Sequence, residues 1–468
     1  MTPIPLKADG QPVKVFIFGD LMVSSGFGRI TNEIARRLAM RGWNILGASL
    51  QYAGWPFTNI GFPVVPLGGR DINSMWITLA QVIQAENPDV MIVCQDFPYA
   101  VTTYHALHID WSVRKFITVT PIDGVPIAPD WLDLVDQVDA TMVISRFGVE
   151  AMAQSGKQVD LLHPGVDLNE FYPAEDKAEV AALRTRAGIP EGAFVTGSFM
   201  MNQGRKMVSK TVEVFGEFAH NKPDAYLIMD MEAASPAGWD IKKTMQQLGW
   251  PEKLRARVLC REDLVKPGVD ILGLRERYIL CDISSQMAHR EGFGLPNLES
   301  MACKVPPMVL DWCSGSEIAG GGKGILIRRL DYMEMGTWGG ARDAFPDVSD
   351  WLRKWNHMYH HRDHVQVAAV TGYEWAKNQT WDNAANQLEK VLRHVVTAQK
   401  KERKANEHFN TITPGLADTA DSRGNPAPSL PAADSLGDRP GLLQNSPDAG
   451  RPAGNPGQAG GNGQLRAD

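Results

Sequence analysis

Residues 13–40 read VKVFIFGDLMVSSGFGRITNEIARRLAM, and this stretch decides which fold is expected. Residues 13–19 form a short, β-branched and nearly all-apolar run, which is typical of a strand buried in a parallel sheet. A glycine-containing loop follows, and Ile30, Ile34 and Leu38 then recur at helical spacing. A strand, a glycine loop and an amphipathic helix in this order predict the opening of a Rossmann-like α/β domain.

The same alternation of short apolar runs and helical patterns continues through most of the chain. It predicts a second α/β domain after the first, with parallel sheets that face a cleft between the domains. The further runs that we predict as strands span residues 90–94, 116–119, 140–144, 194–199, 225–229, 257–259, 279–283, 307–310 and 324–327.

Composition shifts along the chain predict where the domains end. The segment 161–173 (LLHPGVDLNEFYP) is rich in proline and turn residues, so we place the boundary there. Glycine and proline dominate the last part of the chain, which predicts disorder. The predicted parts are a first domain at 1–170, a second at 190–350, helices at 351–404 and a disordered tail at 405–468.

Charge and cysteine usage exclude several classes of protein. The formal net charge of −7 argues against a surface built to hold nucleic acid, so no stable nucleic-acid complex is expected. The five cysteines contain no C-x-x-C pair, which favours reduced, buried thiols over disulfides or zinc. No secretion signal and no run of 18 apolar residues is visible, so we expect a cytoplasmic protein. The first helix carries several arginines that could meet anionic lipid, but a solvated face is the simpler interpretation.

The loop between the first strand and the first helix is a candidate anion site. Gly26 and Gly28 allow close approach of the backbone, and the start of the helix presents N–H groups to a negative ligand such as phosphate. The alternative is a tight strand-to-helix turn that binds nothing. The loop does not follow G-x-G-x-x-G, so a hydride-transfer cofactor is not implied.

Residues 291–299 read EGFGLPNLE and contain the second candidate site. Glu291 and Glu299 flank a glycine-containing loop that leads into a helix, so both carboxylates can meet one ligand. Carboxylates accept hydrogen bonds from sugar and ribose hydroxyls. The alternative is a helix cap together with a surface glutamate.

Three segments resemble glycosyltransferase family 4, the group 1 glycosyltransferases with the GT-B fold. Residues 281–318 are similar to the family's donor-binding region, in which two glutamates surround a Gly-Phe-Gly-Leu-Pro turn. Residues 165–173 resemble its Gly-Val-Asp-x-x-x-Phe-x-Pro hinge. Arg205 and Lys210 resemble its Gly-Arg-x-x-x-x-Lys diphosphate clamp, and an arginine fork with a lysine suits a leaving diphosphate.

The resemblance implies a retaining transferase that uses a nucleotide diphosphate-sugar as donor, with no cofactor, bound metal or covalent protein nucleophile. Glu299 would hold the nucleotide ribose, and the final helix would return to the first domain. The departing diphosphate would help to take the acceptor proton. The groups implied to hold the sugar are Glu291 and the backbone of Gly292, Phe293, Gly294 and Leu295.

This chain departs from the family pattern at three positions. Family members commonly carry a histidine near the end of a first-domain strand, where this chain offers Asp123. Asp123 could position a hydroxyl, act as a base toward the acceptor, or merely cap a turn. Thr211 and Lys304 stand where glycine is frequent.

Other interpretations remain open at this point. The same scaffold could serve a sugar-nucleotide epimerase, a phosphorylase or a non-catalytic nucleotide-sugar-binding protein. The acceptor could be a glycan, a small molecule, a protein or a modified DNA base; tail-bearing members of this kind resemble those carried by bacteriophages. The helical spacing of His357, His360, His361 and His364 lacks the glutamate of H-E-x-x-H, so a packing or hydrated helix is favoured over a metal site.

Overall fold

The computed structural model describes residues 3–7, 9–55, 60–264, 273–335 and 340–398. All of these lie in one compact unit. The predicted tail at 405–468 and the last residues of the helical region predicted at 351–404 lie outside the described residues. The domain boundaries predicted near residues 170 and 190 stay a prediction.

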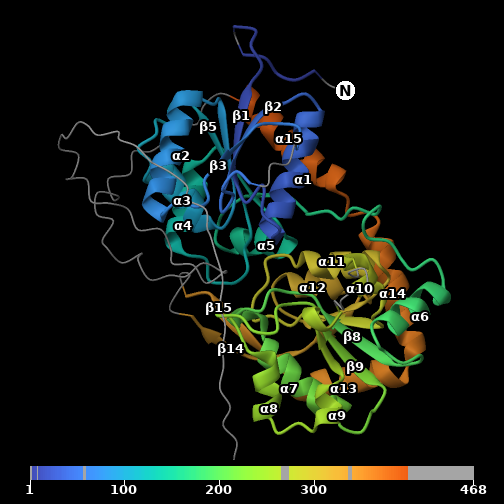
Figure 1. Cartoon of the computed structure of the whole chain (residues 1–468). Helices are drawn as coiled ribbons and strands as arrows, with labels where there is room; N and C mark the ends of the chain where they lie inside the picture. The colour runs from blue at the N-terminus through green and yellow to red at the C-terminus, as the bar shows by residue number, and fades with distance from the viewer. Residues whose placement is uncertain (1–2, 8, 56–59, 265–272, 336–339, 399–468) are drawn as a thin grey trace, which may run out of the picture. The chain divides into compact units, whose positions relative to one another are not determined.

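The first half of the chain builds a parallel sheet of seven strands in the order β3-β2-β1-β4-β5-β6-β7 (Figure 1). The apolar strand β1 is central, and Val15 pairs with both Ile45 and Val90. Because all strands run parallel, their carboxyl ends meet at one edge, where ligands bind in open α/β sheets. The strands are β1 (Lys14–Gly19), β2 (Asn44–Ser49), β3 (Val64–Pro66), β4 (Val90–Cys94), β5 (Lys115–Thr120), β6 (Ala140–Val143) and β7 (Asp160–Leu161).

Helices cover this first sheet because its apolar strands have two faces to bury. The buried residues of α1 (Gly26–Met40) and α15 (Trp381–Thr397) pack in one core, and those of α2 (Ile72–Glu86), α3 (Phe97–His105) and α4 (Pro129–Gln137) pack in another. The helix α5 (Arg146–Gln154) follows β6.

The second half repeats the architecture with a parallel sheet of six strands, in the order β10-β9-β8-β11-β12-β13. Its strands are β8 (Phe194–Ser198), β9 (Ala225–Met229), β10 (Val258–Cys260), β11 (Ile283–Ser285), β12 (Pro307–Leu310) and β13 (Ile325–Ile327). A separate antiparallel hairpin follows it, made of β14 (Arg329–Glu334) and β15 (Arg342–Pro346).

The helical elements of the second half surround this sheet and then lead back to the first. They are α6 (Lys177–Arg186), η1 (Gly204–Lys206), α7 (Val208–Ala219), α8 (Ile241–Gln247), α9 (Glu252–Arg255), η2 (Arg261–Leu264), α10 (Leu274–Ile279), α11 (Leu295–Ala302), α12 (Ser314–Ala319), α13 (Val348–His360) and α14 (Arg362–Ala376). None of the helices in the described ranges is long and apolar enough to cross a bilayer.

The last helix, α15, lies along α1 (Figure 1). Arg41 Nη1 lies 2.7 Å from Glu389 Oε2, and Arg37 Nε lies 3.1 Å from Asp382 Oδ1. These two arginines of the first helix therefore face carboxylates of the same chain.

The α/β class and the two parallel sheets confirm the predicted fold. Strands β4, β9 and β12 have the predicted bounds. The strand predicted at 279–283 was wrong in its placement, because Ile279 ends α10 and the strand begins only at Ile283. A short apolar run does not distinguish the end of a buried helix from a buried strand.

Candidate functional site

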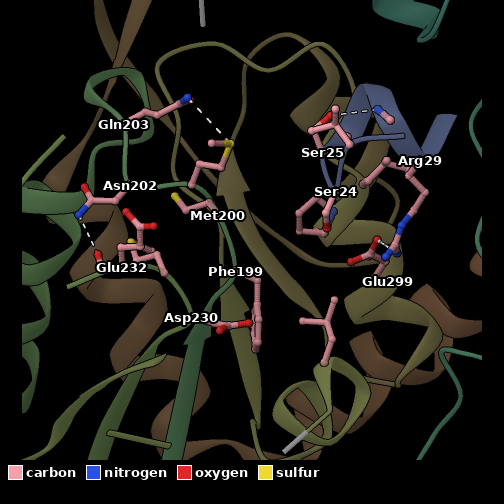
Figure 2. Close-up of a pocket in the computed structure, with 18 of the residues that line it drawn as sticks. Ser24, Ser25, Arg29, Phe199, Met200, Asn202, Gln203, Asp230, Glu232 and Glu299 are labelled. Carbon is pink, nitrogen blue, oxygen red and sulfur yellow. Dashed lines mark hydrogen bonds and ion pairs between the residues drawn. The ribbon is translucent and has the colours of Figure 1, made fainter. Parts of the chain in front are cut away.

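A cavity of about 1130 Å³ lies among loops from both parallel sheets. In Figure 2, Ser24 and Arg29, near the start of α1, lie across the cavity from Asn202 and Gln203, in the loop after β8. The start of α11 also lines the cavity, and Glu299 lies on that helix. A cavity of this size accommodates a ligand larger than a typical drug molecule.

The two glycines predicted to approach an anion both line this cavity, but they differ in their surroundings. Ser25 caps α1 by accepting a 3.0 Å hydrogen bond from the N–H of Gly28. A Cβ added to Gly28 would lie 1.8 Å from the carbonyl oxygen of Val23, whereas one added to Gly26 would find only Leu295 Cδ1, at 4.0 Å. Gly28 is therefore required by backbone packing, and Gly26 leaves open space near the cavity.

Glu299 is buried in the wall of the cavity, with 6% of its surface exposed. It accepts hydrogen bonds from Arg29 Nη1 at 2.5 Å and from the Tyr278 hydroxyl at 2.9 Å. Burial raises the pKa of Glu299, while the charge of Arg29 and the hydrogen bond from Tyr278 act in the opposite direction. Carboxylate oxygens have lone pairs beyond those used here, so Glu299 can still accept a hydroxyl from a ligand.

Glu291 lies in a cluster of charges and is not among the residues that line this cavity. Its carboxylate pairs with Lys206 Nζ and lies 3.6 Å from Arg205 Nη1. Burial acts to raise the pKa of Glu291, but the two cations outweigh it and the pKa is lowered overall. The structure therefore brings Glu291 and Arg205 together and keeps Glu291 ionised.

The lysine beside Glu291 is Lys206, a residue that the sequence pattern did not select. Lys206 has a side chain that is 13% exposed, whereas that of Lys210 is 42% exposed. Lys210 pairs instead with Glu213, at 2.6 Å on the same helix. Burial and the neighbouring Arg205 lower the pKa of Lys206, and Glu291 opposes this shift. The direct adjacency of Arg205 and Lys206 was the one sequence signal available for this lysine.

The turn at residues 292–295 is closely packed. A Cβ on Gly292 would lie 2.5 Å from Pro121 Cβ, in the loop after β5, and Gly294 has a φ of +88° that suits glycine. Ser314 Oγ donates to the carbonyl oxygens of Glu291 at 2.8 Å and Phe293 at 3.0 Å. This close packing around the glycines fixes the position of Glu291 against both sheets. Phe293 and Leu295 of the same turn are buried.

Asp123 joins the same cluster through Arg290, which sequence reasoning missed. Arg290 Nη1 lies 3.6 Å from Asp123 Oδ1, and Arg290 Nε donates to Asp343 in β15. The carbonyl oxygen of Arg290 accepts a 2.9 Å hydrogen bond from Arg205 Nη1. The buried Arg290 thus contacts Asp123 through its side chain and Arg205 through its backbone, and Glu291 is the next residue in the chain. No spacing rule distinguishes such an arginine from a solvated one.

The four histidines do not share one helix, because His357 and His360 lie in α13, His361 lies at the break after it and His364 lies in α14. His357 Nε2 lies 2.7 Å from His364 Nδ1. Within the described residues, no group of three or more His, Cys, Asp or Glu side chains is arranged to hold a metal ion. All five cysteines are buried free thiols.

Comparison with known proteins adds independent information. No family model matches the chain. It is 24% identical over 324 residues to N-acetyl-alpha-D-glucosaminyl L-malate synthase of Bacillus anthracis, an alignment that covers 63% of this chain and 76% of that protein. It is 26% identical over 229 residues to D-inositol 3-phosphate glycosyltransferase of Mycobacterium sp. (strain JLS), covering 47% of this chain and 44% of that relative. The chain therefore aligns with less than half the length of the second relative.

Solved structures share the fold across most of the described chain. Sucrose-phosphate synthase from Thermosynechococcus elongatus superposes with a TM-score of 0.66 at 14% identity, over 83% of this chain and all of that one. The chain is similar in sequence to these two glycosyltransferases and shares its fold with this synthase. Another structure with the same fold is that of Anabaena Alr3699/HepE in complex with UDP-glucose, with a TM-score of 0.60 at 14% identity over 81% of this chain and 99% of that one. The two sheets of this chain are those of the GT-B fold.

Proposed function

We propose that this chain is a member of glycosyltransferase family 4 that transfers a sugar from a nucleoside diphosphate-sugar to an acceptor hydroxyl, with retention at the anomeric carbon. One observation carries the proposal: Glu291 lies against Arg205 and Lys206, at the start of the short segment that ends at Glu299 in the wall of the large cavity. These residues supply carboxylates for sugar and ribose hydroxyls and cations for phosphates, which are the groups that a nucleoside diphosphate-sugar presents.

In the proposed complex, the nucleotide lies in the cavity with its ribose on Glu299. The diphosphate faces the open side of Gly26 at the start of α1, where helix N–H groups favour an anion. Arg205 and Lys206 bind the diphosphate from the other side. Because a diphosphate competes with Glu291 for Lys206, donor binding frees carboxylate oxygens of Glu291 for sugar hydroxyls.

The bond changes follow from this placement. The acceptor oxygen bonds to the anomeric carbon on the face from which the diphosphate departs, and the bond from that carbon to the phosphate oxygen breaks. The acceptor proton moves to the departing phosphate oxygen. Arg205 and Lys206 stabilise the charge that develops on the diphosphate, a kind of interaction that is worth about 10²–10³-fold in rate when one donor group is removed from an enzyme. Asp123, held by Arg290, positions the acceptor hydroxyl.

The relatives suggest which donor to test first. HepE was solved with UDP-glucose, so a UDP-sugar is the first candidate for this chain. The two curated relatives are named for inositol 3-phosphate and for malate, both of which are anionic small molecules. A small anionic acceptor is therefore the first class to test, before glycans, proteins and modified DNA bases.

The test is release of nucleoside diphosphate from UDP-, GDP- and ADP-sugars, with and without acceptors. We expect turnover by the unaltered chain and a loss of about 10²-fold in Glu291→Gln, which keeps the shape but removes the charge. Glu213→Gln is the matched control because Glu213 pairs only with the exposed Lys210 among the described residues. Equal rates in Glu291→Gln and the unaltered chain would refute the proposal. Donor consumption that needs no acceptor and yields an isomeric sugar nucleotide would instead indicate an epimerase, and a strict need for inorganic phosphate would indicate a phosphorylase.

A further inference from the structure

A second cavity, of about 870 Å³, lies apart from the one described above, and the two share no lining residue. Its walls come from α5, from β7 and the loop after it, and from the segment that runs from the end of β12 to the start of β14. The helices α14 and α15 and the segment between them complete the walls. The lining residues that carry the following argument are Arg146, His163, Trp312, Lys323, Arg329 and Trp375.

Two cations in this cavity lie over tryptophan rings instead of against carboxylates. Lys323 Nζ lies 5.0 Å from the centre of the Trp375 ring, and Arg329 Cζ lies 4.4 Å from that of Trp312. Within the described residues, neither Lys323 nor Arg329 has a carboxylate at ion-pair distance. Burial lowers the pKa of Lys323, Glu317 raises it and Arg146 lowers it. Both cations are therefore available to an anion, and aromatic faces hold them in place.

The main acidic group in the wall already has partners. Glu317 Oε1 lies 3.1 Å from His163 Nε2, and Glu317 Oε2 accepts a 2.7 Å hydrogen bond from the backbone N–H of Arg146. The Arg146 guanidinium is 3.8 Å from Glu317, and its side chain is 74% exposed. Asp311, another acid of the wall, accepts from Ser316 Oγ at 2.5 Å. Because Glu317 and Asp311 already have these partners, they repel an anionic ligand less than unpaired carboxylates would.

A donor in the wall also lacks a partner. The indole N–H of Trp312 is buried and has no hydrogen-bond partner among the described residues. A buried donor that stays unsatisfied is unfavourable for the folded state.

We propose that this second cavity binds a small anionic molecule that contains a ring, such as a sugar phosphate. Lys323 and Arg329 bind the anionic group, and the ring lies against the tryptophans. The proposal rests on this cavity's own residues. Only the coupling described next rests on the proposed function.

The cavity wall connects directly to the loops that carry Glu291 and Asp123. Cys313 lines the cavity and lies 3.0 Å, Sγ to oxygen, from the carbonyl of Asp123, to which it donates. Ser314, the next residue, holds the carbonyl oxygens of Glu291 and Phe293. A ligand bound at Trp312 therefore lies two residues along the chain from Ser314, whose hydroxyl holds the carbonyl oxygen of Glu291. If the ligand and the donor affect one another, each must change the affinity of the other by the same factor.

The experiment is calorimetric titration of the full chain with glucose 6-phosphate, compared with glucose and with inorganic phosphate. We expect saturable binding of glucose 6-phosphate, weaker binding of phosphate and none of glucose. Arg329→Gln and Lys323→Gln should each weaken binding of glucose 6-phosphate about tenfold, in line with the loss of one charge-assisted contact. Arg353→Gln is the control because Arg353 pairs with Asp350 and lines neither cavity. Thermal unfolding of each variant shows whether it is folded.

Two further measurements separate the outcomes. Product analysis with a sugar nucleotide present shows whether the bound sugar phosphate is glycosylated, as an acceptor would be, or unchanged, as an effector would be; the site stands in both cases. No binding of glucose 6-phosphate by the unaltered chain, or equal binding by Arg329→Gln and Lys323→Gln, would overturn the proposal. If no nucleotide sugar is turned over but these two variants still lose binding, the proposed function fails and the second site remains.

Discussion

Lys206→Ala should lower the turnover of a sugar nucleotide by about 10²–10³-fold, whereas Lys210→Ala should change it by less than about threefold. The two lysines differ in where their side chains lie. Lys206 contacts Glu291 and lies beside Arg205, and the proposed function places the leaving diphosphate against these two cations. Lys210 is exposed and paired with Glu213 on the same helix, and exposed pairs of this kind contribute little.

The measurement is kcat and KM for the best sugar nucleotide found in the donor screen. Because Lys206→Ala leaves the charge of Glu291 uncompensated by that lysine, thermal unfolding must show that the variant is folded under assay conditions. Lys206→Arg keeps the charge and should recover part of the lost kcat. A large loss in Lys210→Ala with little loss in Lys206→Ala would show that the spacing of the family motif is a better guide than the geometry described here.

Gly28→Ala should destabilise the chain by about 3 kcal/mol, whereas Gly26→Ala should cost less than about 1 kcal/mol. A Cβ on Gly28 would lie 1.8 Å from the backbone oxygen of Val23 and 2.7 Å from that of Asp20, so the loop after β1 must move. At Gly26 the nearest atom to an added Cβ is 4.0 Å away. Gly26 also lines the large cavity, so Gly26→Ala should weaken donor binding while the fold is retained.

Urea unfolding followed by circular dichroism gives the stability difference, provided that the transition is a single cooperative step. Donor affinity is then measured on Gly26→Ala alone, because that variant is expected to stay folded. Equal stabilities of Gly28→Ala and the unaltered chain would contradict the packing described for this loop. An unchanged donor affinity in Gly26→Ala would mean that the donor does not approach the start of α1.

The sequence predicts those parts of the fold that consist of continuous apolar runs between turns. Strands β4, β9 and β12 are buried along their whole length or nearly so, and their bounds are readable for that reason. The strand β2 (NILGAS) was missed because small and polar residues interrupt its pattern. The hairpin β14–β15 was missed because β14 is exposed throughout, and tertiary contacts such as the hydrogen bond from Arg342 N to Val125 O hold the hairpin.

The candidate site was predictable as far as motif order and spacing determine it. Glu291, Glu299 and Arg205 could be named in advance, and the structure places Arg205 with Glu291. The choice between Lys206 and Lys210 depends on which way each side chain points, since Lys206 ends the 3₁₀ turn η1 and Lys210 lies in α7, and spacing carries no such information. Lys304, which stands where the family often has glycine, has a φ of +56°, so the left-handed turn persists although the residue differs.

The central claim is that one sugar nucleotide bridges Glu299 and the cluster of Glu291, Arg205 and Lys206. The most direct measurement is a crystal structure of the chain with UDP bound. The account predicts the ribose hydroxyls within hydrogen-bond distance of Glu299 and the diphosphate oxygens within the same reach of Arg205 and Lys206. A diphosphate bound elsewhere, with Lys206 still paired only with Glu291, would contradict it.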